Sequence, residues 1–266
     1  MEVTQKLPPK TLVEEAGVGI TIDMPKPGKF IVVEGADGAG KSTFCKNLAE
    51  VMRKRYLINV VEDVEFTHGF VGQYIRKHFN DGTLPNGELQ LLALLDRLHH
   101  ITKLDGVSQL TEYSYPAYTV VCDRGWMSTL AYALAVNDND IHSERLKLLM
   151  YLTDLISIVS MSPHLTIFID ISEETARERI RERGDAERFE EDETITKVHK
   201  AYHQLIELMK LDDPFNEYIN FTDNFITIDG EDTETEMVAE ACTKMEYLGM
   251  FTPFMKGDIS DGYKLH

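Results

Sequence analysis

The chain has 266 residues, of which 43% are hydrophobic and 27% are charged, a composition that excludes collagen-like and wholly disordered proteins. Its formal net charge of −18 at pH 7 opposes binding to nucleic acid, which relies on clustered Lys and Arg. The cysteines Cys45, Cys122 and Cys242 lack metal-ligand spacing, and their odd number does not indicate a disulfide framework. Without a membrane-length apolar run or a signal-peptide pattern, the sequence predicts a cytoplasmic protein that binds neither membranes nor nucleic acid.

The chain begins with a segment, residues 1–29, that contains four prolines and mixes polar with apolar residues. We expect it to form an N-terminal arm outside the core. A single domain is predicted over residues 30–250, because a chain of this length is sufficient for one larger α/β core. Residues 251–266 combine glycine, proline and aromatic residues without periodicity and are predicted to form a C-terminal tail.

Within the predicted domain, short apolar runs alternate with longer helical patterns. The runs predict strands at residues 30–34, 57–62, 118–123, 165–170 and 225–229. The longer patterns predict helices at residues 41–55, 88–104, 142–160, 173–183, 194–209 and 233–248. Apolar strands separated by helices are typical of a parallel sheet that is covered on both faces. The predicted fold class is therefore α/β, with a doubly wound five-stranded sheet.

The segment GADGAGKST, residues 35–43, lies between the first predicted strand and the first predicted helix. It has the Gly-x4-Gly-Lys-Ser pattern, and this strand-loop-helix context is the one that a phosphate-binding P-loop requires. Its backbone N–H groups and lysine would hold phosphates, and its serine hydroxyl suits Mg²⁺. The sequence therefore predicts ATP and Mg²⁺ as ligands. The candidate ATP-binding residues are Gly35, Ala36, Gly38, Ala39, Gly40, Lys41, Ser42 and Thr43.

Arginine-bearing segments follow the P-loop along the chain: LLDRLHH at 94–100, CDRGWMS at 122–128 and RIRERGDAERFEED at 179–192. Ligands of open α/β sheets bind outside the carboxyl ends of the strands, so an arginine directly after a strand is expected near the P-loop. The third segment leaves a predicted helix through Gly184 and is highly charged. Its composition predicts a mobile lid at about residues 181–192.

Six motifs follow one another along the chain: FIVVEGADGAGKST, LLALLDRLHH, VVCDRGWMSTLAY, LTIFIDIS, RERGDAERFEE and FITIDGED. In this order, they resemble the motifs of the thymidylate kinases, which are P-loop nucleoside monophosphate kinases. The resemblance covers roughly residues 30–248 and implies transfer of the γ-phosphate of ATP to a deoxynucleoside monophosphate, dTMP or a related or modified nucleotide. It also implies a homodimer.

The resemblance assigns roles to residues of the acceptor site. Asp37 would approach the acceptor's sugar, Arg124 would bind its phosphate, and Arg97 would reach the edge of its base. The remaining candidate substrate-binding residues are Glu65, Phe66, Ser128 and Tyr202.

Catalytic residues are expected in the P-loop and in the lid. Gly38 stands where other members have an arginine, and the resemblance implies that the lid then supplies the catalytic arginines. Phosphoryl transfer needs positioning and positive charge rather than a protein nucleophile, which agrees with this assignment. The candidate catalytic residues are Lys41, Arg181, Arg183 and Arg188.

Candidate metal ligands are Ser42, Asp123 and Asp170. Each aspartate ends an apolar strand, so each would serve either as a partner of magnesium or as a cap of the turn that follows.

Several positions depart from the family pattern. Val64 stands in place of an arginine, Ala93 in place of the aromatic that stacks on the base, and Ala133 in place of a glutamine. These changes predict a more open base pocket, with Phe66, His68, Phe70 or Tyr74 as residues that could refill it. Fewer polar groups would read the base, which favours a larger or modified deoxynucleotide as the acceptor.

Two other functions remain open from the sequence. A deoxynucleoside kinase would need a carboxylate base after the second strand, and Glu65 is placed there. A nucleotide-binding protein without turnover would have little use for the lid arginines. Asp37 and the LLDR segment fit the monophosphate kinase pattern better than either alternative.

Overall fold

The computed structural model describes residues 28–79, 83–103, 118–159, 163–184, 192–210 and 224–254. Most of the predicted arm, the central part of the predicted lid with Arg188, and residues 255–266 of the predicted tail lie outside these ranges. The division into an arm, a domain over residues 30–250 and a tail stays a prediction. Among the described residues, no helix is both long enough and apolar enough to cross a membrane.

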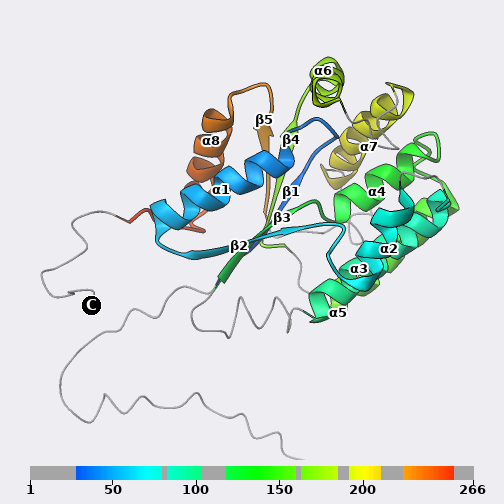
Figure 1. Ribbon diagram of the computed structural model, residues 1–266, viewed down its shortest axis with the longest axis horizontal. Helices are drawn as coiled ribbons and strands as arrows, with labels where there is room; N and C mark the ends of the chain where they lie inside the picture. Colours follow the sequence, from blue (N-terminus) through cyan, green and yellow to red (C-terminus); the bar gives the residue numbers. More distant parts are fainter. Residues whose placement is uncertain are drawn as a thin grey trace, which may run out of the picture.

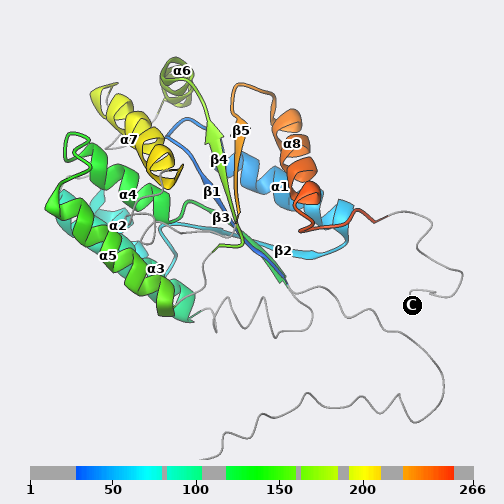
Figure 2. The ribbon, with the colours of Figure 1, turned by 180° about the vertical axis from the view of Figure 1, so that it is seen from behind.

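A parallel sheet with the strand order β2-β3-β1-β4-β5 forms the centre of the molecule (Figures 1 and 2). β1 lies in the middle and pairs Val33 with Asp123 on one side and with Ile167 on the other. This order brings the carboxyl ends of β1 and β3 together. The strands are β1 (Phe30–Glu34), β2 (Asn59–Val64), β3 (Tyr118–Asp123), β4 (Leu165–Asp170) and β5 (Phe225–Asp229).

Helices cover both faces of the sheet, as predicted. α1 and α8 lie on one face, and α4, α5 and α7 lie on the other, with α2 and α3 beyond them (Figures 1 and 2). The helices in chain order are α1 (Lys41–Tyr56), α2 (Phe70–Phe79), α3 (Asn86–Lys103), α4 (Trp126–Ala135), α5 (Glu144–Val159), α6 (Glu173–Arg183), α7 (Asp192–Lys210) and α8 (Glu234–Tyr247).

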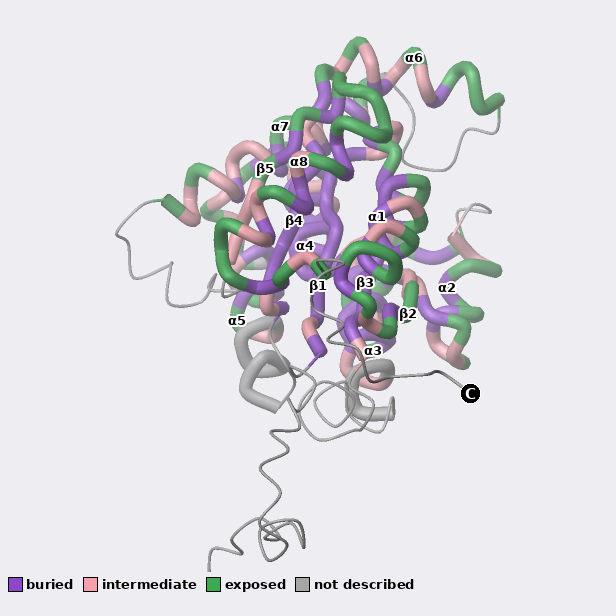
Figure 3. Tube along the Cα trace, turned by 90° about the vertical axis from the view of Figure 1, so that its left-hand side faces the viewer, coloured by how far each residue is buried: buried purple, intermediate pink, exposed green. Residues whose placement is uncertain are grey.

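Alternation along the strands creates a separate core on each face. On β1, Ile31 and Val33 pack with α1 and α8, whereas Phe30 and Val32 face the opposite side. The tube view shows the strands as a buried centre between helices whose outer surfaces are exposed (Figure 3). Buried residues of α4, α5 and α7 form a further cluster around Phe168 of β4. Apolar strands with two covered faces require this three-layer arrangement.

Every predicted strand and helix is present, with bounds that differ from the predictions by two residues at most. The largest change in a strand is in β2, which begins at Asn59 rather than at residue 57, because Leu57 ends α1 in the left-handed region with φ 50°. The helices α2 and α4 were not predicted. α4 is almost wholly buried and lacks an amphipathic pattern, and α2 contains Gly72, a weak helix former.

The α1 face of the core gives a stability prediction. Leu48 is fully buried between α1 and the sheet, so Leu48→Ala is expected to reduce the free energy of unfolding by about 2–5 kcal/mol. Leu148→Ala is the matched control, because Leu148 lies on α5 with 54% of its surface exposed. Urea unfolding of both variants measures the difference. Equal losses in the two variants would contradict this packing.

Candidate active site

The P-loop connects β1 to α1 and follows a path that only glycine tolerates at its centre. Gly38 has φ +81°, and a Cβ built on it would lie 2.7 Å from the carbonyl oxygen of Ala176 in α6. Gly35 is restricted in the same way by the carbonyl oxygen of Ile169, also 2.7 Å from a built Cβ. The close contact with α6 and β4 thus explains why small residues occupy the loop.

Lys41 and Ser42 begin α1 and hold the P-loop against β3. The Lys41 Nζ donates to the Ala36 carbonyl oxygen at 2.8 Å, and burial, assisted by repulsion from Arg124, lowers the pKa of Lys41 to about 8. The Ser42 hydroxyl donates to Asp123 Oδ2 at 2.5 Å. The other carboxylate oxygen of Asp123, Oδ1, is buried and has no hydrogen-bond partner in the part of the chain that the structure describes.

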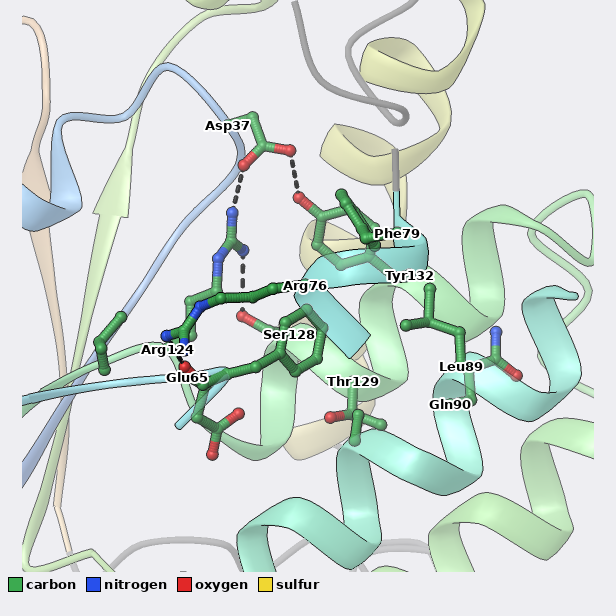
Figure 4. Close-up of a pocket in the computed structure, with 13 residues that line it drawn as sticks. Asp37, Glu65, Arg76, Phe79, Leu89, Gln90, Arg124, Ser128, Thr129 and Tyr132 are labelled. Carbon is green, nitrogen blue, oxygen red and sulfur yellow. Dashed lines mark hydrogen bonds and ion pairs between the residues drawn. The ribbon is translucent and has the colours of Figure 1, made fainter. Parts of the chain in front are cut away.

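Arg124 links the end of β3 to the P-loop. Its backbone adopts φ 76°, and its N–H donates to the Val33 carbonyl oxygen at 2.9 Å. The guanidinium group forms an ion pair with Asp37, which also accepts a hydrogen bond from the Tyr132 hydroxyl (Figure 4). Burial disfavours the ionised form of Asp37 and acts to raise its pKa, but the positive charges of Arg124 and Lys41 hold that pKa below the usual value.

A buried carboxylate anchors α4 and α7 to β1. Glu34 is fully buried and accepts hydrogen bonds from the hydroxyls of Ser128 at 2.6 Å and Tyr202 at 3.1 Å. Burial raises the pKa of Glu34. Ser128 also accepts from Arg124 at 3.3 Å and lines the cavity, but Tyr202 is fully buried and does not line it.

Arg97 and Glu65 form a buried ion pair beside the cavity. The Nε and Nη2 atoms of Arg97 donate to the two carboxylate oxygens of Glu65. The guanidinium carbon of Arg97 also lies 4.2 Å from the ring centroid of Trp126. Glu65 is thereby held as the counterion of Arg97, an arrangement that does not favour the role of a free general base.

A cavity of about 430 Å³ lies between the P-loop, β2, α2, α3 and α4 (Figure 4). Val64 and Ala93 line it, so two of the departures from the family pattern do lie at the site. Ala133 instead packs in the core around α4. The lining residues are Asp37, Val64, Glu65, Phe66, Arg76, Phe79, Leu89, Gln90, Ala93, Arg124, Ser128, Thr129 and Tyr132.

Aromatic side chains line part of this cavity, and of the four expected at the base pocket only Phe66 is among them. Phe66 lines the cavity as predicted, and its ring centroid lies 6.0 Å from that of Phe79, which the sequence did not indicate. His68, Phe70 and Tyr74 are not among the lining residues, and Phe70 is 82% exposed.

Three polar residues of the site were missed in the sequence. Arg76 of α2 lines the cavity and donates to the Thr67 carbonyl oxygen at 2.6 Å. Gln90 of α3 lines it as well. Arg179 of α6 reaches the P-loop, where it donates to the Gly38 carbonyl oxygen at 3.5 Å. For Arg179, the only signal in the sequence was the row of arginines before Gly184. Arg76 had no signal, because α2 was not predicted as a helix.

Arg181, Arg183 and Asp170, which the sequence also predicted as site residues, are not among the residues that line the cavity. Arg181 and Arg183 are exposed in the last turn of α6, which ends at Gly184. Asp170 ends β4, and its carboxylate lies 3.3 Å from His203 Nε2. Ser42 is bonded to Asp123 instead, so the two candidate metal-binding aspartates have different partners.

The doubly wound sheet, the P-loop at its centre and an arginine-edged cavity beside that loop define a P-loop phosphotransferase. The sequence model of the thymidylate kinase family matches residues 33–241. A probable thymidylate kinase of Methanococcus aeolicus is 32% identical over 200 residues, which cover 74% of this chain and 88% of that protein. The thymidylate kinase of Desulfotalea psychrophila is 34% identical over 185 residues, 67% of this chain and 82% of that protein.

The chain therefore belongs to the thymidylate kinase family and is a nucleoside monophosphate kinase with ATP as a substrate. The fold agrees with that of a solved thymidylate kinase from Candida albicans, with a TM-score of 0.62 and 21% sequence identity. This superposition covers 86% of the present chain and 96% of the yeast chain.

The buried pair of Arg97 and Glu65 gives a second stability prediction. Glu65→Ala would leave the guanidinium group buried without its counterion, so we expect a loss of about 3–5 kcal/mol in the free energy of unfolding. Glu62→Ala, on β2 just before Glu65, removes a carboxylate from a pair with Arg53 whose side chains are 42% and 40% exposed, and is expected to cost less than about 1 kcal/mol. If chemical denaturation gave similar losses in the free energy of unfolding for both variants, the conclusion that Arg97 and Glu65 form a buried ion pair would be wrong.

Proposed function

We propose that the protein transfers the γ-phosphoryl group of ATP to the 5′-phosphate of dTMP. One observation carries this proposal: a cavity of nucleotide size opens beside the P-loop, with Arg124 and Asp37 where the two meet. Membership in the thymidylate kinase family supports the reaction and the acceptor. The homodimer that the sequence resemblance implies stays a prediction.

The P-loop would hold the phosphates of ATP. Its backbone N–H groups and the N-terminus of α1 supply partial positive charge, and Lys41 adds a full charge. The buried Lys41 reaches its ordinary protonated state more readily beside phosphates, because their negative charge offsets the burial that lowers its pKa.

Ser42 and Asp123 fit a magnesium ion. The Ser42 hydroxyl and Asp123 Oδ2 lie together, and Asp123 Oδ1, which has no partner among the described residues, can accept a cation or a donor beside it. Oxygen ligands of this kind are the ones that Mg²⁺ prefers. When bound there, Mg²⁺ would neutralise charge on the phosphates of ATP. Asp170 is the weaker candidate because its carboxylate lies beside His203.

Arg124 and Arg76 would bind the acceptor phosphate together. Both guanidinium groups lie at the cavity wall, and two charge-assisted donors suit a phosphate dianion. Val64 provides no charge where the family pattern has an arginine, so Arg76 would supply the second cation.

Asp37 and Tyr132 would position the sugar. The ion pair with Arg124 and the hydrogen bond from Tyr132 fix the Asp37 carboxylate at the junction of the loop and the cavity (Figure 4). Each carboxylate oxygen has a second lone pair with which to accept a hydrogen bond from a hydroxyl of the sugar.

The base would lie over Ala93 on α3. Gln90, Ala93 and Arg97 are spaced at i, i+3 and i+7, so they share one face of this helix. Among the described residues, Gln90 Oε1 and Arg97 Nη1 are buried polar atoms without hydrogen-bond partners. One is an acceptor and the other a donor, which complements the N–H donor and carbonyl acceptor on the edge of thymine.

The small side chain of Ala93 also supports tolerance of a larger base. An alanine fills less of the cavity than the aromatic residue of the family pattern, and a volume of about 430 Å³ remains beside Phe66 and Phe79. We therefore expect deoxyuridine monophosphates with larger groups on the ring than methyl to be accepted as well.

The arginines of the lid would stabilise the transferring phosphoryl group. Gly38 leaves no room for a side chain in the P-loop, and the predicted lid begins with Arg181 and Arg183 and contains Arg188. The deoxynucleoside kinase alternative is less well supported, because it needs Glu65 as a base and Glu65 is paired with Arg97. A binding protein without turnover is not supported by the family.

The experiment that tests the function is ADP release from ATP and Mg²⁺ with a panel of acceptors. We expect turnover with dTMP and with larger 5-substituted deoxyuridine monophosphates, and none with thymidine. Activity with thymidine alone would contradict the proposal. If dTMP exceeded every other acceptor by orders of magnitude, the proposed tolerance at Ala93 would be wrong while the reaction itself would stand.

The role of Arg76 predicts a selective change in affinity. Arg76→Met is expected to raise KM for dTMP by about 10–100-fold, the effect of one hydrogen bond to a charged group, and to leave KM for ATP nearly unchanged. Arg53→Met, which removes an exposed cation from α1, is the control. An equal rise in both KM values would indicate general damage to the site instead.

The proposed role of the lid arginines predicts that their removal lowers the rate of phosphoryl transfer but leaves ATP binding largely intact. Replacing Arg181 and Arg183 together by alanine is expected to lower kcat by about 10²–10³-fold, because positive charge at the transferring group stabilises the transition state. The Kd for ATP should change by much less. Lys147→Ala, at an exposed surface pair, provides the control for loss of one cation. Unchanged kcat in the double variant would exclude these arginines from catalysis.

A further inference from the structure

A cluster of two histidines and one aspartate lies outside the lining of the cavity and does not include Ser42 or Asp123. Its members are Asp170 at the end of β4 and His199 and His203 on α7, and it is called the His–Asp cluster below. One ligand atom of each residue lies within 4.8 Å of those of the other two. His199 and His203 are four residues apart, so one turn of α7 places both imidazoles on the same face.

Neighbouring groups already orient the two imidazole rings. His199 Nε2 lies 2.7 Å from the Ile171 carbonyl oxygen, to which its N–H donates, and this leaves Nδ1 with a lone pair. His203 stands edge-on against Phe168, with 6.1 Å between ring centroids. When one ring nitrogen of a histidine binds a metal, the N–H of the other commonly donates a hydrogen bond to a backbone carbonyl in this way, which fixes the ring.

The spacing within the cluster suits a transition metal. His203 Nε2 and Asp170 Oδ1 are 3.3 Å apart, which is about the separation of two ligands in a tetrahedral zinc site with bonds of about 2.0–2.1 Å. The rings of His199 and His203 lie close as well, at 4.6 Å between centroids. Each of the three residues is partly exposed, so an ion can enter from solvent.

We propose that the His–Asp cluster binds one divalent transition-metal ion, with Zn²⁺ as the preferred species. Two imidazole nitrogens and one carboxylate favour Zn²⁺ over Mg²⁺, which prefers oxygen ligands. The site is separate from Ser42 and Asp123 and does not depend on the proposed reaction. A bound ion would join the end of β4 to α7, the helix that follows the predicted lid.

The test is a titration of untagged, chelator-treated protein with Zn²⁺ in the presence of excess Mg²⁺, which occupies sites made of oxygen ligands. Isothermal titration calorimetry is expected to show one Zn²⁺ per chain. His199→Ala and His203→Ala should each weaken binding by about tenfold or more, and the double variant should abolish it. His142→Ala, which removes an exposed histidine elsewhere, should bind Zn²⁺ like the unchanged protein.

A second measurement keeps the test valid if a variant folds poorly. Zn²⁺ should raise the melting temperature of the unchanged protein and of His142→Ala, but not that of the double variant, whose melting temperature without Zn²⁺ shows whether it is folded. The absence of a one-to-one site in the unchanged protein, or a site that persists in the double variant, would overturn the proposal. Kinase activity has no part in either result.

Discussion

The parallel pairing of β1 with β3 is the constraint on which the whole site depends. It sets Val33 opposite Asp123, so that the P-loop and the Asp123-Arg124 pair leave the sheet side by side. Two hydrogen bonds reinforce this register: Arg124 N–H donates to Val33, and Ser42 donates to Asp123. A shift of one residue in this pairing would separate the P-loop from Arg124 and so separate the P-loop from the cavity that Arg124 lines.

Electrostatics explains how so acidic a chain can hold two nucleotides. The chain as a whole carries a net charge of −18, whereas three cations lie together around Glu34 at the carboxyl end of β1: Lys41 and Arg97, which are buried, and Arg124, which is partly buried. Each of these cations has a partner in the structure: Lys41 donates to the Ala36 carbonyl oxygen, Arg97 pairs with Glu65, and Arg124 pairs with Asp37. Buried charges need such partners, because desolvation would otherwise make them costly. The phosphates of the substrates would share or replace these partners.

The sequence predicted the sheet, its helices and the P-loop because each has a local pattern. Apolar runs mark strands that are buried on both faces, and α1, α3 and α5 to α8 are long enough to show a helical period. It missed α4, which is short and buried on nearly all sides, and α2, in which Gly72 packs directly on the backbone of Thr67. These helices owe their stability to tertiary contacts, which a single sequence does not display.

The same reason divides the site residues. Lys41, Asp37, Arg97 and Arg124 belong to motifs. Lys41 and Asp37 lie in the P-loop, Arg124 lines the cavity, and Arg97 lies behind its wall, paired with Glu65. Whether Arg76, Gln90 and Ala133 reach the cavity depends on which face of α2, α3 and α4 meets it, and no local pattern gave the orientation of these helices.

The most direct test of the account is a crystal structure with a bisubstrate ligand in which adenosine and thymidine are joined by a chain of phosphates. We expect the phosphates on the adenosine side to lie in the P-loop and thymine to lie in the cavity over Ala93. Arg124 and Arg76 should contact the phosphate nearest thymidine. A thymidine group bound outside this cavity, or a phosphate chain that bypasses Arg124, would contradict the central claim.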